Sequence, residues 1–136
     1  MTFVIDSSVT LGWTLADERT EATATVLRIV ASEGAVAPVI WPLEVANSLN
    51  MAVRRKRVTY PISDRHLADL AELTILLDEQ TSANAWSKTL KLADAHGLTV
   101  YDATYLELAL RRELPLATLD RALIAAAARV GVTTLP

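Results

Sequence analysis

The 136-residue chain contains no cysteine and only two histidines. It can therefore form neither a disulfide framework nor a zinc site with thiolate ligands, and two histidines are too few for a histidine-rich metal site. Any metal that it binds should be a hard cation held by oxygen atoms. Apolar runs of roughly 18 residues are absent, and the N-terminus lacks the basic and apolar segments of a signal peptide. We expect a cytoplasmic protein with no membrane partner.

Positive charge is scarce as well, since 13 lysines and arginines against 16 acidic residues give a net charge of −3. This balance provides no global attraction to nucleic acid and argues against a protein that coats DNA. One local cluster departs from it, the segment RRKR formed by Arg54, Arg55, Lys56 and Arg57. Such a cluster is typical of a solvated helix end, where cations complement the helix dipole. It is also a candidate contact for phosphates.

Short apolar runs alternate with amphipathic segments along the chain. The pattern predicts strands over residues 2–5, 35–40, 114–119 and 132–135, with a further short strand near 76–79. It predicts helices over 8–16, 21–31, 42–53, 64–76, 82–95, from 102 onward, and 121–130. Strands that alternate with helices indicate an α/β fold of three layers, in which a parallel sheet of four or five short strands is flanked by helices. No linker or repeat interrupts the pattern, so one domain is expected over residues 1–136.

Acidic residues follow the predicted strands or begin the helices after them. Asp6 directly follows the first strand, and Asp120 follows the strand 114–119. Glu44 lies in the first turn of the helix after the second strand, and Asp102 opens a later helix. In open parallel sheets, sites form at the carboxyl ends of the strands, where the next helices begin. We therefore expect the four carboxylates to meet at one edge of the sheet.

Two interpretations of these acids are open. Asp is a preferred N-cap and Glu in a first turn is favoured by the helix dipole, so each acid alone could simply stabilise a helix start. Other predicted helix starts have hydroxyl residues for this purpose, namely Thr20, Ser63 and Thr81. Like charges gathered in one poorly solvated cleft also repel one another, a cost that capping does not require and that a divalent cation removes.

Several oxygen ligands without nitrogen or sulfur suit Mg²⁺ or Mn²⁺. Such ions activate a bound water and stabilise charge on a phosphoryl group, so the pattern suggests phosphodiester hydrolysis. Ser8 follows Asp6 by two residues and Thr118 precedes Asp120 by two. Their hydroxyls could hydrogen-bond to a carboxylate or a phosphate, with a local cap and ordinary strand packing as the alternatives.

Four segments occur in the order and approximate spacing of the PIN-domain ribonucleases: VIDSSV, PLEVANSL, LTVYDATYLELA and LATLDRAL. Together they span nearly the whole chain, which most resembles the VapC toxins of bacterial toxin-antitoxin pairs and so implies a PIN-like three-layer fold. By this resemblance, a quartet of acids would bind Mg²⁺ or Mn²⁺, and its members are Asp6, Glu44, Asp102 and Asp120. Ser8 and Thr118 would be its supporting polar residues.

The resemblance also implies a substrate and partners. PIN toxins are metal-dependent endoribonucleases, are often homodimers, and are silenced by a small antitoxin that covers the cleft. We therefore expect an RNA substrate, a VapB-like antitoxin, and a homodimer in which the two RRKR segments form a basic rim. Trp13 falls where such toxins often receive the antitoxin, and core packing is the alternative for it.

Three rival classes also fit acids on such a sheet. A response-regulator receiver needs a late lysine near its phosphate, yet the last lysine is Lys91. A phosphatase of the haloacid-dehalogenase type needs Asp-x-Asp, yet two serines follow Asp6. The remaining alternative is a PIN-fold module that only binds a partner, and the presence of all four acids argues against it.

Overall fold

The computed structural model describes residues 2–136 and contains a parallel sheet with the strand order β3-β2-β1-β4-β5. The strands are β1 (Val4–Ile5), β2 (Ala35–Pro38), β3 (Ile75–Asp78), β4 (Leu116–Ala117) and β5 (Thr134–Leu135). The chain builds outward from β1 to β3 and then returns to the other side of β1 for β4 and β5. The topological switch point therefore lies between β1 and β4, where open α/β sheets form their binding sites.

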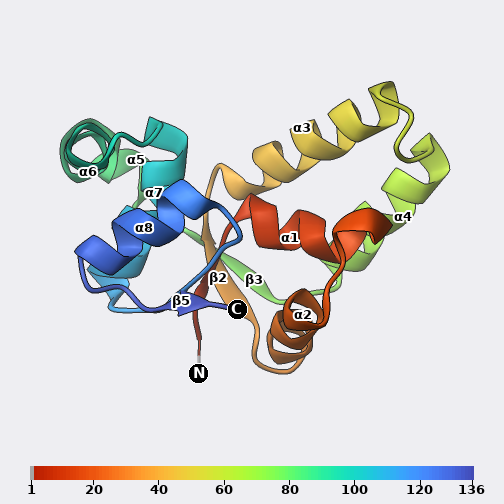
Figure 1. The fold of residues 1–136 in the computed structure, drawn as a ribbon, viewed down its shortest axis with the longest axis horizontal. Coiled ribbons are helices and arrows are strands. Elements are labelled where there is room, and N and C mark those ends of the chain that lie inside the picture. Colours follow the sequence, from red (N-terminus) through yellow and green to blue (C-terminus); the bar gives the residue numbers. More distant parts are fainter. Residues whose placement is uncertain (1) are drawn as a thin grey trace.

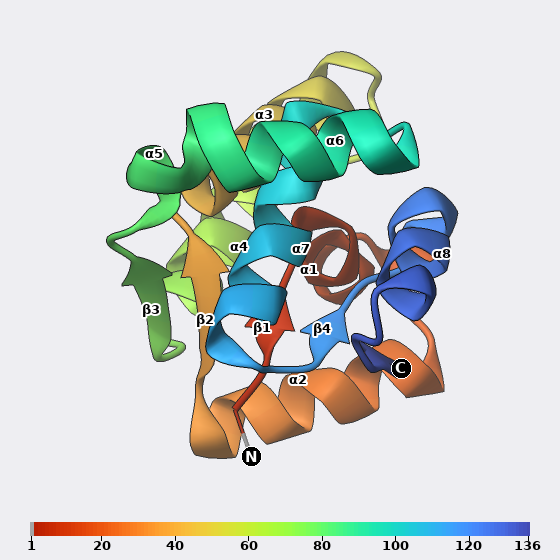
Figure 2. The same cartoon turned by 90° about the vertical axis from the view of Figure 1, so that its left-hand side faces the viewer.

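Helices cover both faces of this sheet, which confirms the predicted three-layer α/β fold (Figure 1). They are α1 (Ser7–Thr14), α2 (Glu21–Glu33), α3 (Trp41–Arg54), α4 (Tyr60–Ala71), α5 (Thr81–Asn84), α6 (Leu90–His96), α7 (Val100–Arg112) and α8 (Arg121–Arg129). Helices α1 to α4 lie on one side and α5 to α8 on the other, and α7 crosses β1, β2 and β4 (Figure 2). Within the described residues, no helix has the length and apolar character needed to cross a membrane.

The core forms where β1 is enclosed by the two helical layers. Both residues of β1 are fully buried, as is Leu106 of α7. Trp13 of α1 is 5% exposed, and its indole N–H donates to the Thr23 carbonyl of α2 at 2.9 Å. The indole therefore belongs to the core, and of the two roles predicted for Trp13, core packing is the one that the structure shows. Helix α2 ends at Gly34, whose φ of 77° is a left-handed value that favours glycine.

The predicted helix over 64–76 differs clearly in its bounds from the helix in the structure. The helix predicted over 64–76 is α4, and it begins earlier because the Thr59 hydroxyl caps its first turn. Ser63, predicted as the cap, is buried inside the helix instead. Because α4 ends sooner, the following residues are free to form β3, the strand predicted near 76–79.

The helix predicted over 82–95 is broken into three parts. After the single turn of α5, residues Ala85–Thr89 form a π-helical segment before α6 continues. Thr81, predicted as a cap, is buried and donates its hydroxyl to the Asp78 carboxylate at 3.0 Å. The π-helical segment presents Trp86 to solvent, where it is 93% exposed.

A buried ion pair joins β3 to α7. Asp78 at the end of β3 and Glu107 in α7 are both buried, and each accepts a hydrogen bond of 2.7 Å from Arg111. Burial acts to raise the pKa of Asp78, but the bonds from Arg111 and Thr81 outweigh burial and hold this pKa below its usual value. The ion pair therefore fixes α7 against the edge of the sheet, and this fixes the position of Asp102 in the first turn of the same helix.

Candidate active site

Asp6 lies at the carboxyl end of β1, next to the switch point of the sheet. Its carboxylate is 4% exposed and caps α1 by accepting the Val9 amide at 3.0 Å. The Ser8 hydroxyl donates to the same carboxylate at 2.7 Å, and the Thr118 hydroxyl donates at 2.5 Å. Donors from three directions therefore fix the carboxylate, and the two hydroxyls predicted as supporting residues both contact it.

Thr118 also connects Asp6 to Asp120. The Thr118 hydroxyl accepts the Asp120 amide at 3.0 Å, and the Ser8 hydroxyl accepts the Leu119 amide at 2.8 Å. These bonds join the start of α1 to the loop after β4, across the switch point. Asp120 itself caps α8, since its carboxylate accepts the amide of the third helical residue at 2.9 Å.

Asp102 lies in the first turn of α7 and is not the cap of this helix. Thr99 is the cap, and its hydroxyl accepts the Asp102 amide at 3.0 Å. The prediction that Asp102 opens the helix was therefore two residues late, because α7 begins at Val100. The capping interpretation holds for Asp6 and Asp120, whereas Asp102 is a half-buried first-turn acid that the helix dipole favours but that is not the cap.

The pKa values of Asp6 and Asp102 are both raised, mainly by burial and further by the charge of Asp120. Burial is the main reason why the pKa of Asp6 rises from 3.8 to about 6, although Thr118, Val9 and Ser8 donate to it, and Asp120 raises it further. Burial also raises the pKa of Asp102, and the charge of Asp120 adds to the effect. Asp120 therefore lies near enough to act on both other acids, and the site carries uncompensated negative charge.

A tyrosine of the opposite helical layer, Tyr105 of α7, holds the Glu44 carboxylate. Glu44 lies in the first turn of α3, and its carboxylate accepts a hydrogen bond of 2.5 Å from the Tyr105 hydroxyl of α7. Burial raises the pKa of Tyr105 above its ordinary value, and the nearby Glu44 and Asp6 carboxylates add to this rise, so the phenol remains a donor. Tyr105 was not predicted as a site residue. Its only signal in the sequence is a position three residues after Asp102, on the same face of a helix.

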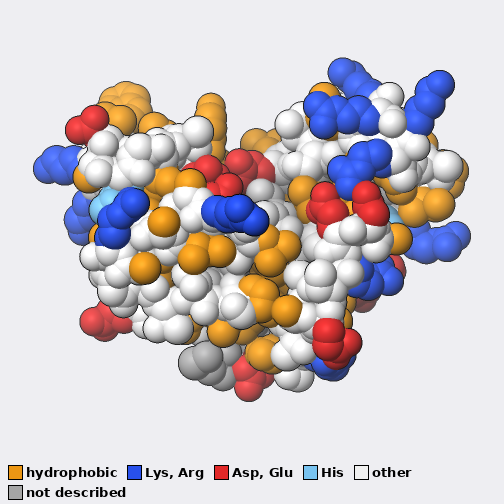
Figure 3. All heavy atoms as spheres, viewed as in Figure 1, with side chains coloured by type: hydrophobic (Ala, Val, Ile, Leu, Met, Phe, Trp, Pro, Cys, Tyr) orange, Lys and Arg blue, Asp and Glu red, His pale blue; other side chains and the backbone are white. Residues whose placement is uncertain are grey.

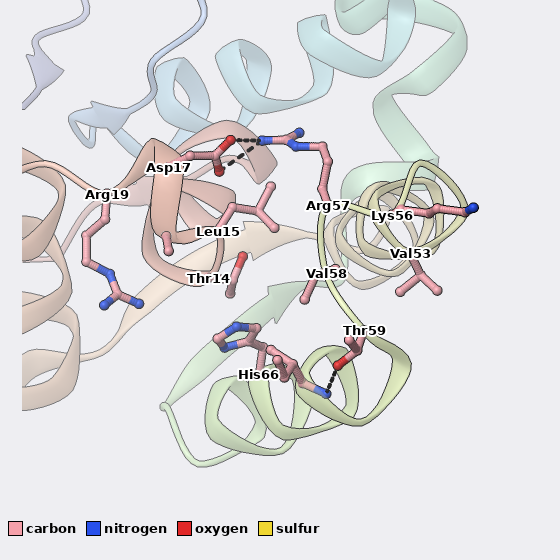
Figure 4. A pocket seen from close by; sticks show the side chains of 12 residues that line it. Thr14, Leu15, Asp17, Arg19, Val53, Lys56, Arg57, Val58, Thr59 and His66 are labelled. Carbon is pink, nitrogen blue, oxygen red and sulfur yellow. Dashed lines mark hydrogen bonds and ion pairs between the residues drawn. The ribbon is translucent and has the colours of Figure 1, made fainter.

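Acidic side chains gather in the hollow between the arm of α3 and α4 and the layer of α8, and cations cluster at the outer end of that arm (Figure 3). Arg54, Arg55 and Lys56 at this end are exposed. Arg57 instead pairs with Asp17 at 2.9 Å beside a pocket of about 740 Å³ (Figure 4). Its charge is therefore matched within the chain, and the other three cations are the better candidates for contact with phosphate.

The donors fit a hard cation, although the acids do not form a closed cage. Among residues 2–136, no group of three or more histidine or acidic side chains could hold a metal ion in this conformation. The available ligands are nonetheless all oxygen atoms, as Mg²⁺ and Mn²⁺ prefer. The repulsion of Asp120 on Asp6 and on Asp102 would also be relieved by a bound divalent ion.

A model of the PIN domain family matches residues 3–129 of this sequence. This chain belongs to the PIN domain family. The match confirms the family that the sequence motifs indicated. Among proteins with curated descriptions, none matches this chain in a sequence comparison.

Solved structures of the same fold include several from toxin-antitoxin pairs. PAE2754 from Pyrobaculum aerophilum is 24% identical, with a TM-score of 0.72 over 98% of this chain and 83% of that one. VapBC2 from Rickettsia felis, bound to a DNA fragment from its promoter, is 12% identical, with a TM-score of 0.66 over 98% and 97%. VapC20 from Mycobacterium tuberculosis, a toxin that cleaves the sarcin-ricin loop, is 17% identical, with a TM-score of 0.57 over 91% and 94%. At these identities the likeness establishes the fold.

The raised pKa of Asp6 predicts how the stability of the metal-free protein depends on pH. With a pKa of 3.8 unfolded and about 6 folded, this carboxyl holds its proton more tightly when folded. Its contribution is therefore fully present below the unfolded pKa of 3.8 and is lost as the pH rises through 6. The total loss is about 3 kcal/mol, most of which falls between about pH 4 and pH 7. Asp6→Asn should abolish this loss while still capping α1, because Asn is an equally good cap.

Urea unfolding between about pH 4 and pH 7, in the presence of chelator, measures the difference in free energy of unfolding between wild type and Asp6→Asn. The exposed Asp94 of α6 provides the control variant Asp94→Asn, which should follow the wild-type curve. Parallel curves for wild type and Asp6→Asn would show that burial does not strain the Asp6 carboxylate.

Proposed function

We propose that this PIN domain is a metal-dependent endoribonuclease that hydrolyses RNA phosphodiester bonds as the toxin of a toxin-antitoxin pair. The observation that carries the proposal is the convergence of acids that, among the described residues, have no lysine or arginine as an ion-pair partner. The charge of Asp120 raises the pKa of both Asp6 and Asp102. Tyr105 contacts Glu44, and the charge of Asp6 raises the pKa of this tyrosine. A site that only binds a protein partner has no need for this unbalanced charge.

In the proposed mechanism, the ligands of Mg²⁺ or Mn²⁺ are Asp6, Glu44, Asp102 and Asp120. When bound, such an ion activates water for attack and stabilises the charge that develops on the phosphoryl group. Ser8 and Thr118 fix the Asp6 oxygens, so this carboxylate presents a constant geometry to the ion. The buried position of Asp6 also excludes water from one side of the site, which strengthens electrostatic interactions there.

Replacing Asp102 by Asn separates metal binding from helix stability. Thr99 remains the cap of α7, so Asp102→Asn should fold and should be at least as stable as wild type without metal, because one repelling charge is removed. Cleavage of a structured RNA pool with Mn²⁺ should nevertheless fall by at least about 100-fold, since even partners of metal ligands contribute 10- to 100-fold. Asp94→Asn serves as the matched control and should cleave normally.

Thermal unfolding gives a second readout of the same site. Mn²⁺ should raise the melting temperature of wild type but not of the Asp6→Asn, Asp102→Asn double variant, because a ligand stabilises only the state that binds it. Cleavage should also stop when chelator is added. Full activity in Asp102→Asn, or equal thermal shifts in all variants, would refute the assignment and favour the non-catalytic module.

The exposed cations at the end of α3 are proposed to contact RNA phosphates. Because each phosphate contact by a cation releases counterions, Arg54→Glu, Arg55→Glu should weaken RNA binding and lower the salt slope of log affinity by roughly 1.4 for single-stranded RNA. The matched control is Arg112→Glu, Arg129→Glu, which changes net charge equally at the far ends of α7 and α8. Fluorescence anisotropy with labelled RNA, in the Asp102→Asn background, measures both quantities. An unchanged slope in the first variant would remove the basic rim from the proposal.

We further propose that the protein forms a homodimer, as the resemblance to VapC toxins implies. Trp86 supports this, since an indole that is 93% exposed, with Leu90 four residues on at 49%, is unusual for an isolated surface. Trp86→Ala should therefore shift the molar mass measured by light scattering from dimer towards monomer. Tyr60 on α4, an aromatic side chain that is 63% exposed, provides the control Tyr60→Ala. A monomeric wild type at micromolar concentration would contradict the dimer.

A small VapB-like antitoxin is the remaining proposed partner. Its support is the family itself, together with the toxin-antitoxin complexes that share this fold, such as VapBC2. An antitoxin that covers the hollow could place a basic residue near the acids and so supply the cation that the chain lacks there. The reading frame adjacent to this one is where such a partner would be encoded.

A further inference from the structure

Tyr105 has an unusual position for a core aromatic residue. Tyr105 is only 1% exposed, yet its hydroxyl donates a hydrogen bond to the Glu44 carboxylate of the candidate site at 2.5 Å. Because the Glu44 carboxylate can only accept, the phenol is the donor and its proton is directed at Glu44.

The Glu44–Tyr105 bond joins two elements on opposite faces of the sheet. Glu44 belongs to α3 in one helical layer, and Tyr105 belongs to α7 in the other (Figure 1). Helix α7 packs on β1, β2 and β4, and the ion pair of Arg111 fixes its far end. The phenol is therefore fixed to the sheet, and its hydrogen bond restrains the Glu44 carboxylate.

Glu44 needs such an anchor more than the other acids do. Asp6 has a short side chain and accepts bonds from Ser8, Thr118 and a backbone amide. Glu44 is only half-buried and has a longer, more flexible side chain, which loses more conformational freedom when it is ordered. A bond that already orders Glu44 reduces the entropy that a bound cation would have to overcome.

We propose that Tyr105 is a positioning residue that holds the Glu44 carboxylate in place as a metal ligand. The proposal rests on the proposed function, since Glu44 is a ligand only if the site binds a divalent ion. The same turn of α7 would then supply both an acid, Asp102, and the group that orients the acid on the facing helix.

Tyr105→Phe tests this proposal, because it keeps the ring and removes only the hydroxyl. We expect the affinity for Mn²⁺, measured by isothermal titration calorimetry on the full chain, to fall by 10- to 100-fold, as for other groups that orient metal ligands. RNA cleavage should recover at saturating Mn²⁺, because Tyr105 does not contact the substrate. The control Tyr101→Phe changes a tyrosine of the same helix that is 63% exposed and should leave Mn²⁺ affinity unchanged.

A double-mutant cycle with Glu44→Gln shows whether Tyr105 acts through Glu44. If it does, Tyr105→Phe should cause little further loss of Mn²⁺ affinity when position 44 is already Gln. If Tyr105→Phe does not fold, Glu44→Asp, whose shorter side chain withdraws from the phenol, should lower Mn²⁺ affinity in its place.

The outcomes separate this proposal from the proposed function. Wild-type Mn²⁺ affinity in Tyr105→Phe, or an equally large loss in the Glu44→Gln background, would overturn the positioning role while the nuclease assignment stands. A fall in melting temperature with unchanged Mn²⁺ affinity would show a purely structural bond and would overturn it too. Absence of Mn²⁺ binding and cleavage in wild type would overturn both.

Discussion

The buried carboxylate of Asp6 is the constraint on which the rest of the site depends. It ends the central strand at 4% exposure, and hydroxyl and amide groups surround it without a cation. An ion buried in this way is costly, as its pKa near 6 reflects. The donors must stay in place to limit that cost, so Ser8 of α1 and Thr118 after β4 have to remain in register. The first and last parts of the chain are thereby joined at the switch point.

This requirement explains how so short a sheet can carry a defined site. β1 and β4 contribute two residues each, and their few ladder bonds alone would constrain the following loops weakly. The side-chain bonds around Asp6 fasten these loops to each other, and the Glu44–Tyr105 bond fastens the two helical layers above them. The walls of the hollow are therefore set by polar contacts at the edge of the sheet as well as by the core.

Local patterns predicted most of the fold because they reflect local physics. Apolar runs marked the strands, and acids at strand ends identified Asp6 and Asp120 correctly as neighbours across the switch point. Helix starts were less certain, because several hydroxyls compete as caps and Thr99 precedes Asp102. The apolar spacing of the sequence did not indicate the break within residues 81–96, so a single helix was predicted there. The Tyr105 contact could not be predicted, since it joins residues 61 positions apart and depends on how two layers meet.

Two buried aspartates at the same edge of the sheet, Asp78 and Asp6, differ in how their charge is balanced. Asp78 also ends a strand at the same edge of the sheet, but Arg111 neutralises it together with Glu107, and the pKa of Asp78 is lowered. Asp6 receives only neutral donors, and its pKa is raised. Asp78 is thus a structural acid whose charge is balanced by an arginine. It leaves the acids at the switch point unpaired, and a binding site for a cation requires this unpaired charge.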